Sequence, residues 1–450
     1  MRYVIVGNSY AGVGAVEAIR EIDREGDITM ISDEPYLAYA RPLISYALGG
    51  RIPSRNMYYR NEGFYRKNRV RLFLGKRTMA IRSRARQVLL EDDQVLEYDR
   101  LLISTGGEPF IPPLKGLDAR NIFSFTKWDD AKRIKRTARD KRKVVVYGGG
   151  LIGLKAAEGL NDLGLEVTMV ARRRILAAAL DEVSGGMLEK RLRDNGITLR
   201  TGRTVKEVRC DGRGDVCEVV LDNERRPRCE ILILAVGTRP RTELAKNTPI
   251  RTNKGILVDR RMMTSVKDIY AAGDVAEAHN VLNNGDSVIA IVPLAYEQGR
   301  VAGHNMAGGH RLYSGGMGMN AVTVYGLPIV TIGSANQMDD TREVRTFRKG
   351  NIYRKLVFEG NRLVGAVLVS AIDYAGILTR FIRSRADIAG IKRELTEHVL
   401  RKGEFGPVLL KIGGALIPCS SGVYEHGIDG RVPPEKGNGG KALWNIKANV

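Results

Sequence analysis

Two glycine-rich segments, each placed directly after a short apolar run, limit the folds open to this chain more than any other feature. They read Val4-Ile5-Val6-Gly7-Asn8-Ser9-Tyr10-Ala11-Gly12 and Val144-Val145-Val146-Tyr147-Gly148-Gly149-Gly150-Leu151-Ile152-Gly153. A strand, a tight glycine turn and a helix together present backbone N–H groups to a pyrophosphate. One copy is weak evidence, but two copies, each between an apolar run and a helix-like segment, predict two dinucleotide sites.

The first fingerprint opens a predicted βαβ unit, with strands at 4–6 and 28–31 and a helix at 11–22. Asp33 and Glu34 follow the second strand, where an acid accepts hydrogen bonds from a ribose hydroxyl. Ser9 replaces the usual second glycine, which lets the backbone approach the phosphates closely. We therefore expect Ser9 to push the phosphates slightly outward or to add a hydroxyl contact.

A second apolar run follows each fingerprint and ends in a similar turn. Residues 101–103 lead into Ser104-Thr105-Gly106-Gly107, and residues 231–234 lead into Ala235-Val236-Gly237-Thr238. The repetition predicts an internal duplication in which both copies are doubly wound.

A third signal places an acid directly after an apolar strand. Residues 269–271 are followed by Ala272, Gly273 and Asp274. A carboxylate at this position is suited to binding sugar or ribityl hydroxyls. The alternative is an aspartate that only caps the N-terminus of a helix.

Length and composition exclude several classes of protein. A chain of 450 residues predicts about three domains. No run of about 18 apolar residues is present, so we expect no membrane span, and the absence of a signal peptide predicts a cytoplasmic protein. The four cysteines form no C-x-x-C pair and the five histidines show no ligand spacing. We therefore expect no disulfide framework and no metal or iron–sulfur site.

The net charge of +21 is large. Such a charge attracts acidic partners or polyanions. The basic residues are scattered and form no nucleic-acid motif, which favours an acidic redox protein or neighbouring subunit over DNA or RNA. An arginine-rich solvated surface without a partner explains the same charge.

The pattern changes beyond residue 325. It predicts antiparallel strands at 329–332, 344–347, 352–358 and 363–368, and helices at 371–383 and 391–400. From about residue 427 the chain contains Pro433-Pro434 and Gly437-Asn438-Gly439-Gly440, which are typical of a flexible tail. Docking of this tail onto a partner is the alternative.

The order of these motifs resembles the FAD-dependent pyridine nucleotide–disulfide oxidoreductase superfamily over about residues 1–400. The resemblance implies an α/β fold with two doubly wound, Rossmann-like domains and an α+β interface domain. The expected limits are 1–112 with 246–325 for a split FAD domain, 113–245 for an NAD(P) domain, 326–425 for the interface domain and 426–450 for the tail.

The resemblance also implies two sets of cofactor-binding residues. Residues 39–45 are similar to the segment beside the flavin ring in rubredoxin reductases and nitrite reductase flavin domains, and residues 293–300 are similar to the helix over the flavin. The FAD set is Gly7, Ser9, Tyr10, Ala11, Gly12, Asp33, Glu34, Arg41, Pro42, Ser104, Thr105, Gly106, Gly273, Asp274, Pro293 and Tyr296. The NAD(P) set is Gly148, Gly150, Leu151, Ile152, Gly153, Arg172, Arg173 and Gly237.

Three departures from the superfamily pattern bear on function. The first is that no cysteine precedes Cys210, so thiol chemistry beside the flavin is not expected. Electrons must then leave to a protein acceptor or to oxygen.

The second departure concerns charge near the flavin. Relatives often place a lysine where this chain has Tyr46, and pair it with a glutamate at the position of Lys155. The hypothesis is that Lys155 is catalytic, lies close to the nicotinamide or flavin, and stabilises negative charge there. A solvent-facing helix lysine is the alternative.

The third departure concerns the nicotinamide cofactor. The strand at 167–170 is followed by Ala171, Arg172 and Arg173 rather than by an acid. Guanidinium groups bind a 2′-phosphate, so the pattern favours NADP. NAD stays open because some relatives without this acid use it.

We predict a FAD-dependent NAD(P)H oxidoreductase that exchanges hydride between nicotinamide and FAD and passes electrons to or from a separate partner. The partner expected is ferredoxin- or rubredoxin-like, or an iron–sulfur subunit of a larger complex, and a homodimer is an open possibility. The alternatives are an NAD(P)H oxidase that reduces oxygen and a non-catalytic flavoprotein subunit.

Overall fold

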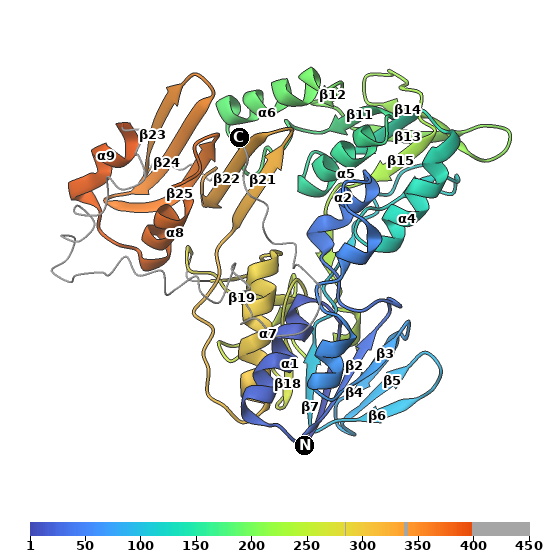
Figure 1. Ribbon diagram of the computed structural model, residues 1–450, viewed down its shortest axis with the longest axis vertical. Coiled ribbons are helices and arrows are strands. Elements are labelled where there is room, and N and C mark those ends of the chain that lie inside the picture. The colour runs from blue at the N-terminus through green and yellow to red at the C-terminus, as the bar shows by residue number, and fades with distance from the viewer. Residues whose placement is uncertain (284, 337–340, 398–450) are drawn as a thin grey trace, which may run out of the picture. The chain divides into compact units, whose positions relative to one another are not determined.

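The computed structural model describes residues 1–283, 285–336 and 341–397 (Figure 1). The chain divides into two compact units, Met1–Ala386 and Asp387–Val450. Within its described residues the second unit contains a 3-10 helix at Ala389–Ile391 and helix α9 (Lys392–Glu397).

A five-stranded parallel sheet carries the first glycine fingerprint. Its strand order is β18-β7-β1-β2-β3, and every neighbouring pair is parallel. β18 follows the second fingerprint in the chain, so the sheet combines two distant segments. The bounds are β1 (Arg2–Val6), β2 (Asp27–Ser32), β3 (Val70–Leu74), β7 (Arg100–Ile103) and β18 (Ile269–Ala271).

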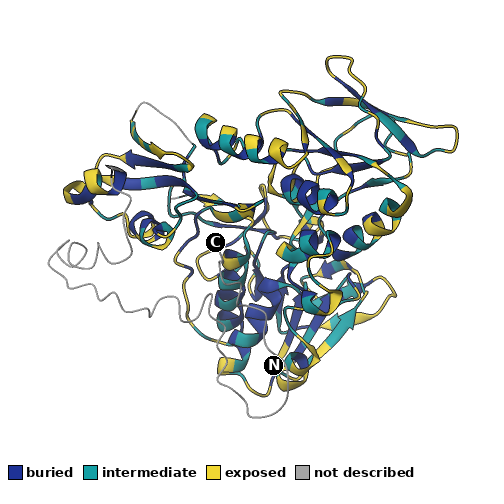
Figure 2. Ribbon diagram, turned by 45° about the horizontal axis from the view of Figure 1, so that its top comes forward, coloured by how far each residue is buried: buried dark blue, intermediate teal, exposed yellow. Residues whose placement is uncertain are grey.

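The strands at the centre of this sheet are buried on both faces. Val4, Ile5, Leu101, Leu102 and Ile103 are each at most 2% exposed. Figure 2 shows this burial as dark blue along the strands, with yellow on the outward sides of the helices. Burial on both faces explains the continuous apolar runs in the sequence.

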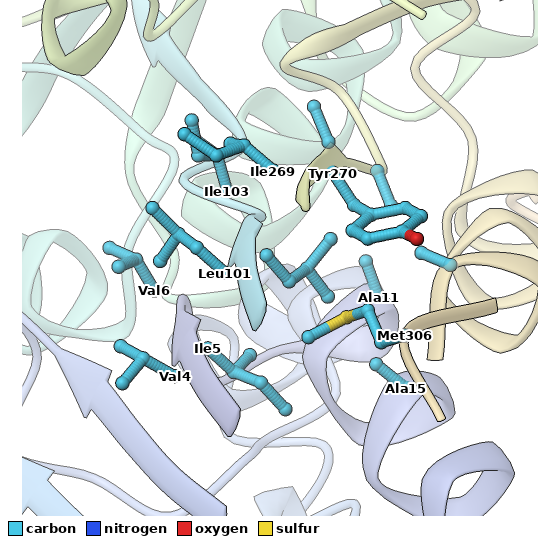
Figure 3. Packing of buried hydrophobic residues seen from close by; sticks show 14 of the residues in the cluster. Val4, Ile5, Val6, Ala11, Ala15, Leu101, Ile103, Ile269, Tyr270 and Met306 are labelled. Carbon is cyan, nitrogen blue, oxygen red and sulfur yellow. The ribbon is translucent and has the colours of Figure 1, made fainter. Parts of the chain in front are cut away.

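Helices α1 (Tyr10–Ile22) and α7 (Val292–Met306) pack closely against each other. A Cβ atom at Gly299 would lie 2.0 Å from the carbonyl oxygen of Ala11, and one at Gly303 would lie 2.3 Å from that of Ala15. Figure 3 shows Ala11 and Ala15 close to Met306, within the same core as the strands of the first sheet. The two helices thus share one apolar core with this sheet.

A second parallel sheet carries the second fingerprint. Its order is β12-β11-β10-β15-β9, again with parallel neighbours. The strands are β9 (Ile122–Phe123), β10 (Lys143–Tyr147), β11 (Glu166–Ala171), β12 (Thr198–Thr201) and β15 (Ile231–Leu234). The helices of this domain are α4 (Trp128–Thr137), α5 (Leu151–Asp162) and α6 (Glu182–Asp194).

Two short strands form the connection between the two nucleotide domains. β8 (Gly107–Pro109) enters the second domain and β16 (Thr238–Pro240) leaves it, and the two pair antiparallel. The amide of Phe110 donates to the carbonyl of Gly237 at 2.9 Å, and Arg239 forms an ion pair with Glu108 at 2.7 Å. The second domain is therefore an insertion whose two ends are adjacent.

The third sheet is antiparallel, with the order β21-β22-β25-β24-β23. Helix α8 (Ala375–Ser384) packs on β22 and β25. The strands are β21 (Met319–Val324), β22 (Leu327–Gly333), β23 (Arg342–Lys349), β24 (Ile352–Glu359) and β25 (Arg362–Val369).

The remaining elements are short. They are α2 (Ile44–Leu48), α3 (Glu62–Lys67), β4 (Thr78–Arg82), β5 (Gln87–Leu90), β6 (Val95–Glu97), β13 (Val205–Cys210), β14 (Val216–Leu221), β17 (Ile256–Leu257), β19 (Ala276–His279) and β20 (Asp286–Ser287). Further 3-10 helices span Arg41–Leu43, Ser54–Met57, Ala138–Asp140 and Glu243–Ala245.

The predicted α/β class with two doubly wound sheets is confirmed. The helix predicted at 371–383 was placed too early: α8 begins at Ala375, because a turn with a positive φ of 68° at Ser370 follows β25. Strand β21 was not predicted. The domain limits remain predictions, and the tail at 426–450, like the end of the helix predicted at 391–400, lies outside the described residues.

Candidate dinucleotide sites

The predicted FAD-binding residues meet at one edge of the first sheet. Gly7 follows β1, Ser104 follows β7, Asp33 follows β2 and Asp274 lies shortly after β18. Because these strands are parallel, their carboxyl ends lie at the same edge, where open α/β sheets bind ligands.

The turn at Gly7 leaves no room for a side chain. Its φ is +124°, and an added Cβ atom would lie 2.1 Å from the carbonyl oxygen of Ser104. A Cβ atom at Gly12 would lie 2.1 Å from the carbonyl oxygen of Gly7. Ser9 is the N-cap of α1 and its hydroxyl makes no capping hydrogen bond, so the hydroxyl remains available to a phosphate at this helix terminus.

The loop after β7 is fixed from both sides. Ser104 Oγ donates to the carbonyl of Val6 at 3.0 Å, and Thr105 Oγ1 donates to the carbonyl of Arg241 at 2.9 Å. Gly106 has a φ of +72° and nothing lies within 4 Å of where its Cβ would be. This open space beside a fixed backbone is suited to a cofactor.

Asp274 is a half-buried acid to which the described part of the chain offers no hydrogen bond or ion pair. Burial raises the pKa of Asp274, and the charge of Arg41 only partly opposes that rise. A carboxylate left unpaired at the ligand edge is suited to accepting hydrogen bonds from ribityl hydroxyls.

Asp33 and Glu34 differ from Asp274 because both have protein partners. Lys127 Nζ and Arg241 Nη1 lie 3.0 Å and 3.1 Å from Asp33 Oδ2. Burial alone would raise the pKa of Asp33, but these two cations hold it below its ordinary value. Glu34 is buried and accepts a hydrogen bond from Tyr39 Oη at 2.6 Å.

Three other predicted FAD residues are fixed by protein contacts. Arg41 forms an ion pair with Glu34 and donates to the carbonyl of Thr126 at 3.1 Å. The ring of Tyr10 lies 4.7 Å from the ring of Tyr59, centre to centre. Tyr296 Oη donates to Glu17, on α1, at 2.6 Å, so it joins α7 to α1.

Two prolines of the predicted set stand in the first turns of helices. Pro42 does so in the 3-10 helix at Arg41–Leu43, and Pro293 does so in α7. A proline is tolerated there because the first turn has no intrahelical acceptor for its missing N–H.

The second site repeats the turn of the first. Gly148 has a φ of +137°, and a Cβ there would lie 2.0 Å from the carbonyl oxygen of Ala235. A Cβ at Gly153 would lie 2.3 Å from the carbonyl oxygen of Gly148. Gly150 caps α5, and at both Gly150 and Gly237 nothing lies within 4 Å of where a Cβ would be. The backbone at Gly150 is therefore open to a pyrophosphate.

Side chains around the second site are accessible. Leu151 is exposed and Ile152 is half-buried at the start of α5. Arg172 and Arg173 follow β11, are exposed, and have no ion pair or hydrogen bond within the described residues. Arg174, by contrast, lies 3.7 Å from Glu182.

Lys155 lies on α5 where this helix packs against α2. Its Nζ is 3.4 Å from Tyr46 Oη and 4.6 Å from the centre of the Tyr46 ring. Lys155 also forms an ion pair with Glu158, and Arg51 lies 3.1 Å from the other oxygen of Glu158. The lysine side chain is 15% exposed, so a solvent-facing lysine is not what the structure shows.

Four charged residues near these sites were missed in the sequence. Lys127 and Arg241 form ion pairs with Asp33. Glu158 forms ion pairs with both Lys155 and Arg51. The spacing of Lys155 and Glu158, one helical turn apart, was a usable signal. Nothing in the sequence indicated Lys127 or Arg241, because their partner is distant in the chain.

The described cysteines lie in the second domain. Cys210 is exposed and Cys217 half-buried, both in the β13-β14 hairpin. Cys229 is buried in the core of the second domain, donates to the carbonyl of Ile231 at 3.0 Å, and has its pKa raised to about 12 by burial.

Two kinds of feature are absent from the described residues. They contain no helix long and apolar enough to cross a membrane. They also contain no group of three or more His, Cys, Asp or Glu side chains placed to hold a metal ion.

Comparison with family models identifies the class. The model described as pyridine nucleotide-disulphide oxidoreductase matches residues 1–299, and the model described as rubredoxin NAD+ reductase C-terminal domain matches residues 319–386. The chain therefore belongs to the pyridine nucleotide-disulphide oxidoreductase family. It is an FAD-dependent oxidoreductase that uses a nicotinamide dinucleotide.

Individual relatives differ in how much of their length the chain matches. It is 29% identical to the NADH-dependent phenylglyoxylate dehydrogenase subunit epsilon of Aromatoleum evansii, over 89% of this chain and 96% of the relative. It is 30% identical to the nitrite reductase [NAD(P)H] of Bacillus subtilis over 86% of this chain, but spans only 48% of that protein. A solved covalent complex of putidaredoxin reductase with putidaredoxin is similar with a TM-score of 0.79 and 26% identity, over 86% of this chain and 94% of that one.

Proposed function

We propose that this chain exchanges hydride between a nicotinamide dinucleotide and FAD and transfers electrons to or from a separate iron–sulfur or rubredoxin-type protein. The observation that carries the proposal is the presence of two open nucleotide turns on two sheets with no cysteine before residue 210. Without a nearby thiol, the protein has no disulfide of its own to reduce at the first site. The family match to a rubredoxin reductase C-terminal domain and the putidaredoxin complex support a protein partner.

The residues present fit FAD at the first sheet. The Gly7 turn and the N-terminus of α1 offer backbone donors for the pyrophosphate, and Asp274 offers an unpaired acceptor for hydroxyls. Bound FAD would supply the chemistry that converts a two-electron hydride transfer into single-electron transfers. The protein contributes binding, orientation and exclusion of water.

For the nicotinamide cofactor we propose NADP over NAD. Arg172 and Arg173 stand at the end of β11 without partners among the described residues, and Ala171 stands where an acid would contact the 2′-hydroxyl. Two such guanidinium groups favour a 2′-phosphate through charge-assisted hydrogen bonds.

We further propose that Lys155 is a catalytic residue that places positive charge where the two domains meet. Its ammonium lies against Tyr46, from the FAD domain, while Glu158 and Arg51 fix its position. Replacing Lys155 with methionine keeps the side-chain length and removes the charge. We expect flavin reduction to slow by at least about tenfold and the flavin potential to fall. A wild-type rate and potential in Lys155→Met would contradict this role.

The first experiment is anaerobic mixing of the FAD-loaded chain with NADH and, separately, NADPH, followed by flavin absorbance. Rapid bleaching supports hydride exchange, and faster bleaching by NADPH, lost in the Arg172→Ala/Arg173→Ala variant, supports the assignment of NADP. Peroxide production in air as fast as transfer to an added rubredoxin or ferredoxin would favour the oxidase alternative. Absence of bleaching with either nucleotide would favour a non-catalytic subunit.

A further inference from the structure

The Asp33 carboxylate contacts both the second nucleotide domain and the second connection, through which the chain leaves that domain. Asp33 lies one residue beyond β2. Lys127, 3.0 Å away, lies between β9 and α4 of the second domain, and Arg241, 3.1 Å away, immediately follows β16 on the second connection. One acid beside the first sheet thus contacts both the second domain and the chain where it leaves that domain.

The two oxygens of this carboxylate have different surroundings. Both cations lie against Oδ2. Oδ1 accepts no hydrogen bond from any residue that the structure describes. The side chains of Asp33 and Arg241 are only 27% and 21% exposed, so their ion pair is screened less than one in open solvent.

The segment around Asp33 contacts the second domain at further points. The amide of Trp128 donates to Tyr39 Oη at 3.1 Å, and Arg41 donates to the carbonyl of Thr126 at 3.1 Å. Among these contacts, only those of Arg241 hold the second connection. The Arg241 amide donates to the carbonyl of Gly106 at 2.9 Å, and the Arg241 side chain contacts Asp33. Loss of the Arg241 side chain would therefore release the second connection from β2.

We propose that Asp33 is a positioning residue that couples FAD binding to the orientation of the second domain. Oδ2 holds Lys127 of the second domain and Arg241 of the second connection, and Oδ1 is free to accept a hydrogen bond from a hydroxyl of FAD. A hydroxyl donor on Oδ1 restricts rotation of the carboxylate and so strengthens the contacts at Oδ2. By thermodynamic linkage, the factor by which bound FAD strengthens the contacts at Oδ2 equals the factor by which those contacts strengthen FAD binding. This inference rests on the proposed assignment of FAD to the first sheet.

The decisive variant is Arg241→Gln, which removes a cation from Oδ2 and leaves Asp33 and every predicted FAD residue in place. Two quantities are measured: the affinity for FAD, and amide hydrogen exchange in residues 105–110 and 237–242 with and without FAD. We expect exchange in the FAD-free protein to rise about fivefold, which corresponds to one partly screened ion pair, and FAD affinity to fall by a factor no larger than that. FAD should also slow exchange less in the variant than in the wild type.

The matched control is Asp92→Asn, which breaks the ion pair between Asp92 and Lys76 (2.7 Å) elsewhere in the FAD domain. Neither quantity should change in this control. If Arg241→Gln does not fold, Lys127→Gln removes the other cation that contacts Asp33 Oδ2. This variant should change the FAD affinity and the amide exchange in the same directions.

Unchanged FAD affinity and unchanged exchange in a folded Arg241→Gln protein would overturn the inference. Faster exchange without loss of FAD affinity would also overturn it, since the contacts would then hold the domains without coupling to the cofactor. Neither readout uses hydride transfer. The outcome is therefore separate from a failure of NADH or NADPH to bleach the flavin.

Discussion

The two nucleotide domains share the same arrangement of strand, glycine turn and helix. The amide of Gly7 donates to Ile31, at the end of the neighbouring strand, at 2.8 Å, and the amide of Gly148 donates to Val170 in the same way at 2.9 Å. β7 pairs with β1 in the first domain in the same register as β15 pairs with β10 in the second. The internal duplication expected from the sequence is thus present at the level of single hydrogen bonds.

The two domains differ in the residues at the ends of their second strands. In the first domain an acid, Asp33, is bound by two cations, and a second acid, Asp274, enters from β18. In the second domain Arg172 and Arg173 are exposed and unpaired within the described residues. A site enclosed by protein contacts is suited to a cofactor that stays bound, whereas an open basic edge is suited to one that exchanges.

The largest effect is expected from filling the shared turn. Gly148→Ala, or Gly7→Ala in the first domain, would place a Cβ within about 2 Å of a carbonyl oxygen at a positive φ. Each should destabilise its domain by at least about 4 kcal/mol and leave little folded protein. Thermal unfolding followed by circular dichroism measures the loss.

Gly150→Ala is the control for this prediction, because its Cβ would point into open space at a φ of −80°. This variant should fold like the wild type and bind the nicotinamide dinucleotide more weakly. Equal stability of the Gly148 and Gly150 variants would show that close packing of the glycine turn against a carbonyl oxygen does not limit which residue can stand at Gly148.

An intermediate effect is expected from transferring the acid of the first domain to the second. Ala171→Asp, combined with Arg172→Ala and Arg173→Ala, supplies an acceptor for the 2′-hydroxyl and removes two charges that suit a 2′-phosphate. The ratio of kcat/KM for NADH over NADPH should rise by about 30-fold, or about 2 kcal/mol. The double arginine variant alone should give a smaller change, and a ratio equal to that of the wild type would rule out this edge as the source of specificity.

The smallest effect is expected at Asp274. Folding raises the pKa of this carboxyl through burial, so its charge destabilises the FAD-free protein as the pH rises above the unfolded value of about 4. Asp274→Asn should therefore raise the stability of the FAD-free protein by about 1 kcal/mol at pH 7.5 and by less at pH 4.5, while weakening FAD binding. A variant less stable than the wild type at pH 7.5 would show that the carboxylate has a partner in the protein.

The sequence was sufficient to predict the two parallel sheets and the glycine turns that follow their first strands. The two glycine fingerprints predicted a strand, a turn and a helix in each domain, and in the structure a Cβ at position 7, 12, 148 or 153 would meet a carbonyl oxygen. Local patterns of this kind report on backbone geometry because strand, turn and helix are contiguous in the chain.

Side-chain partners between distant segments could not be predicted from residue patterns alone. The contact of Asp33 with Arg241 joins residues 208 positions apart, and charge did not indicate it, because 72 lysines and arginines are available in the chain. The contact of Lys155 with Tyr46, 109 positions apart, was indicated only by the family resemblance, which pairs these two positions. The start of α8 was misplaced for a local reason, since the turn after β25 carries no glycine or proline.

The hydrogen bond between Phe110 and Gly237 has a consequence for how such a chain can be rebuilt. Because the inserted segment begins and ends at neighbouring backbone positions, cutting there leaves two ends that a few residues can rejoin. The second domain can be excised, replaced by a related domain, or given the new chain termini of a circular permutant, while β18 still completes the first sheet. Exchange of this one inserted domain would therefore change the nucleotide specificity without altering the first sheet.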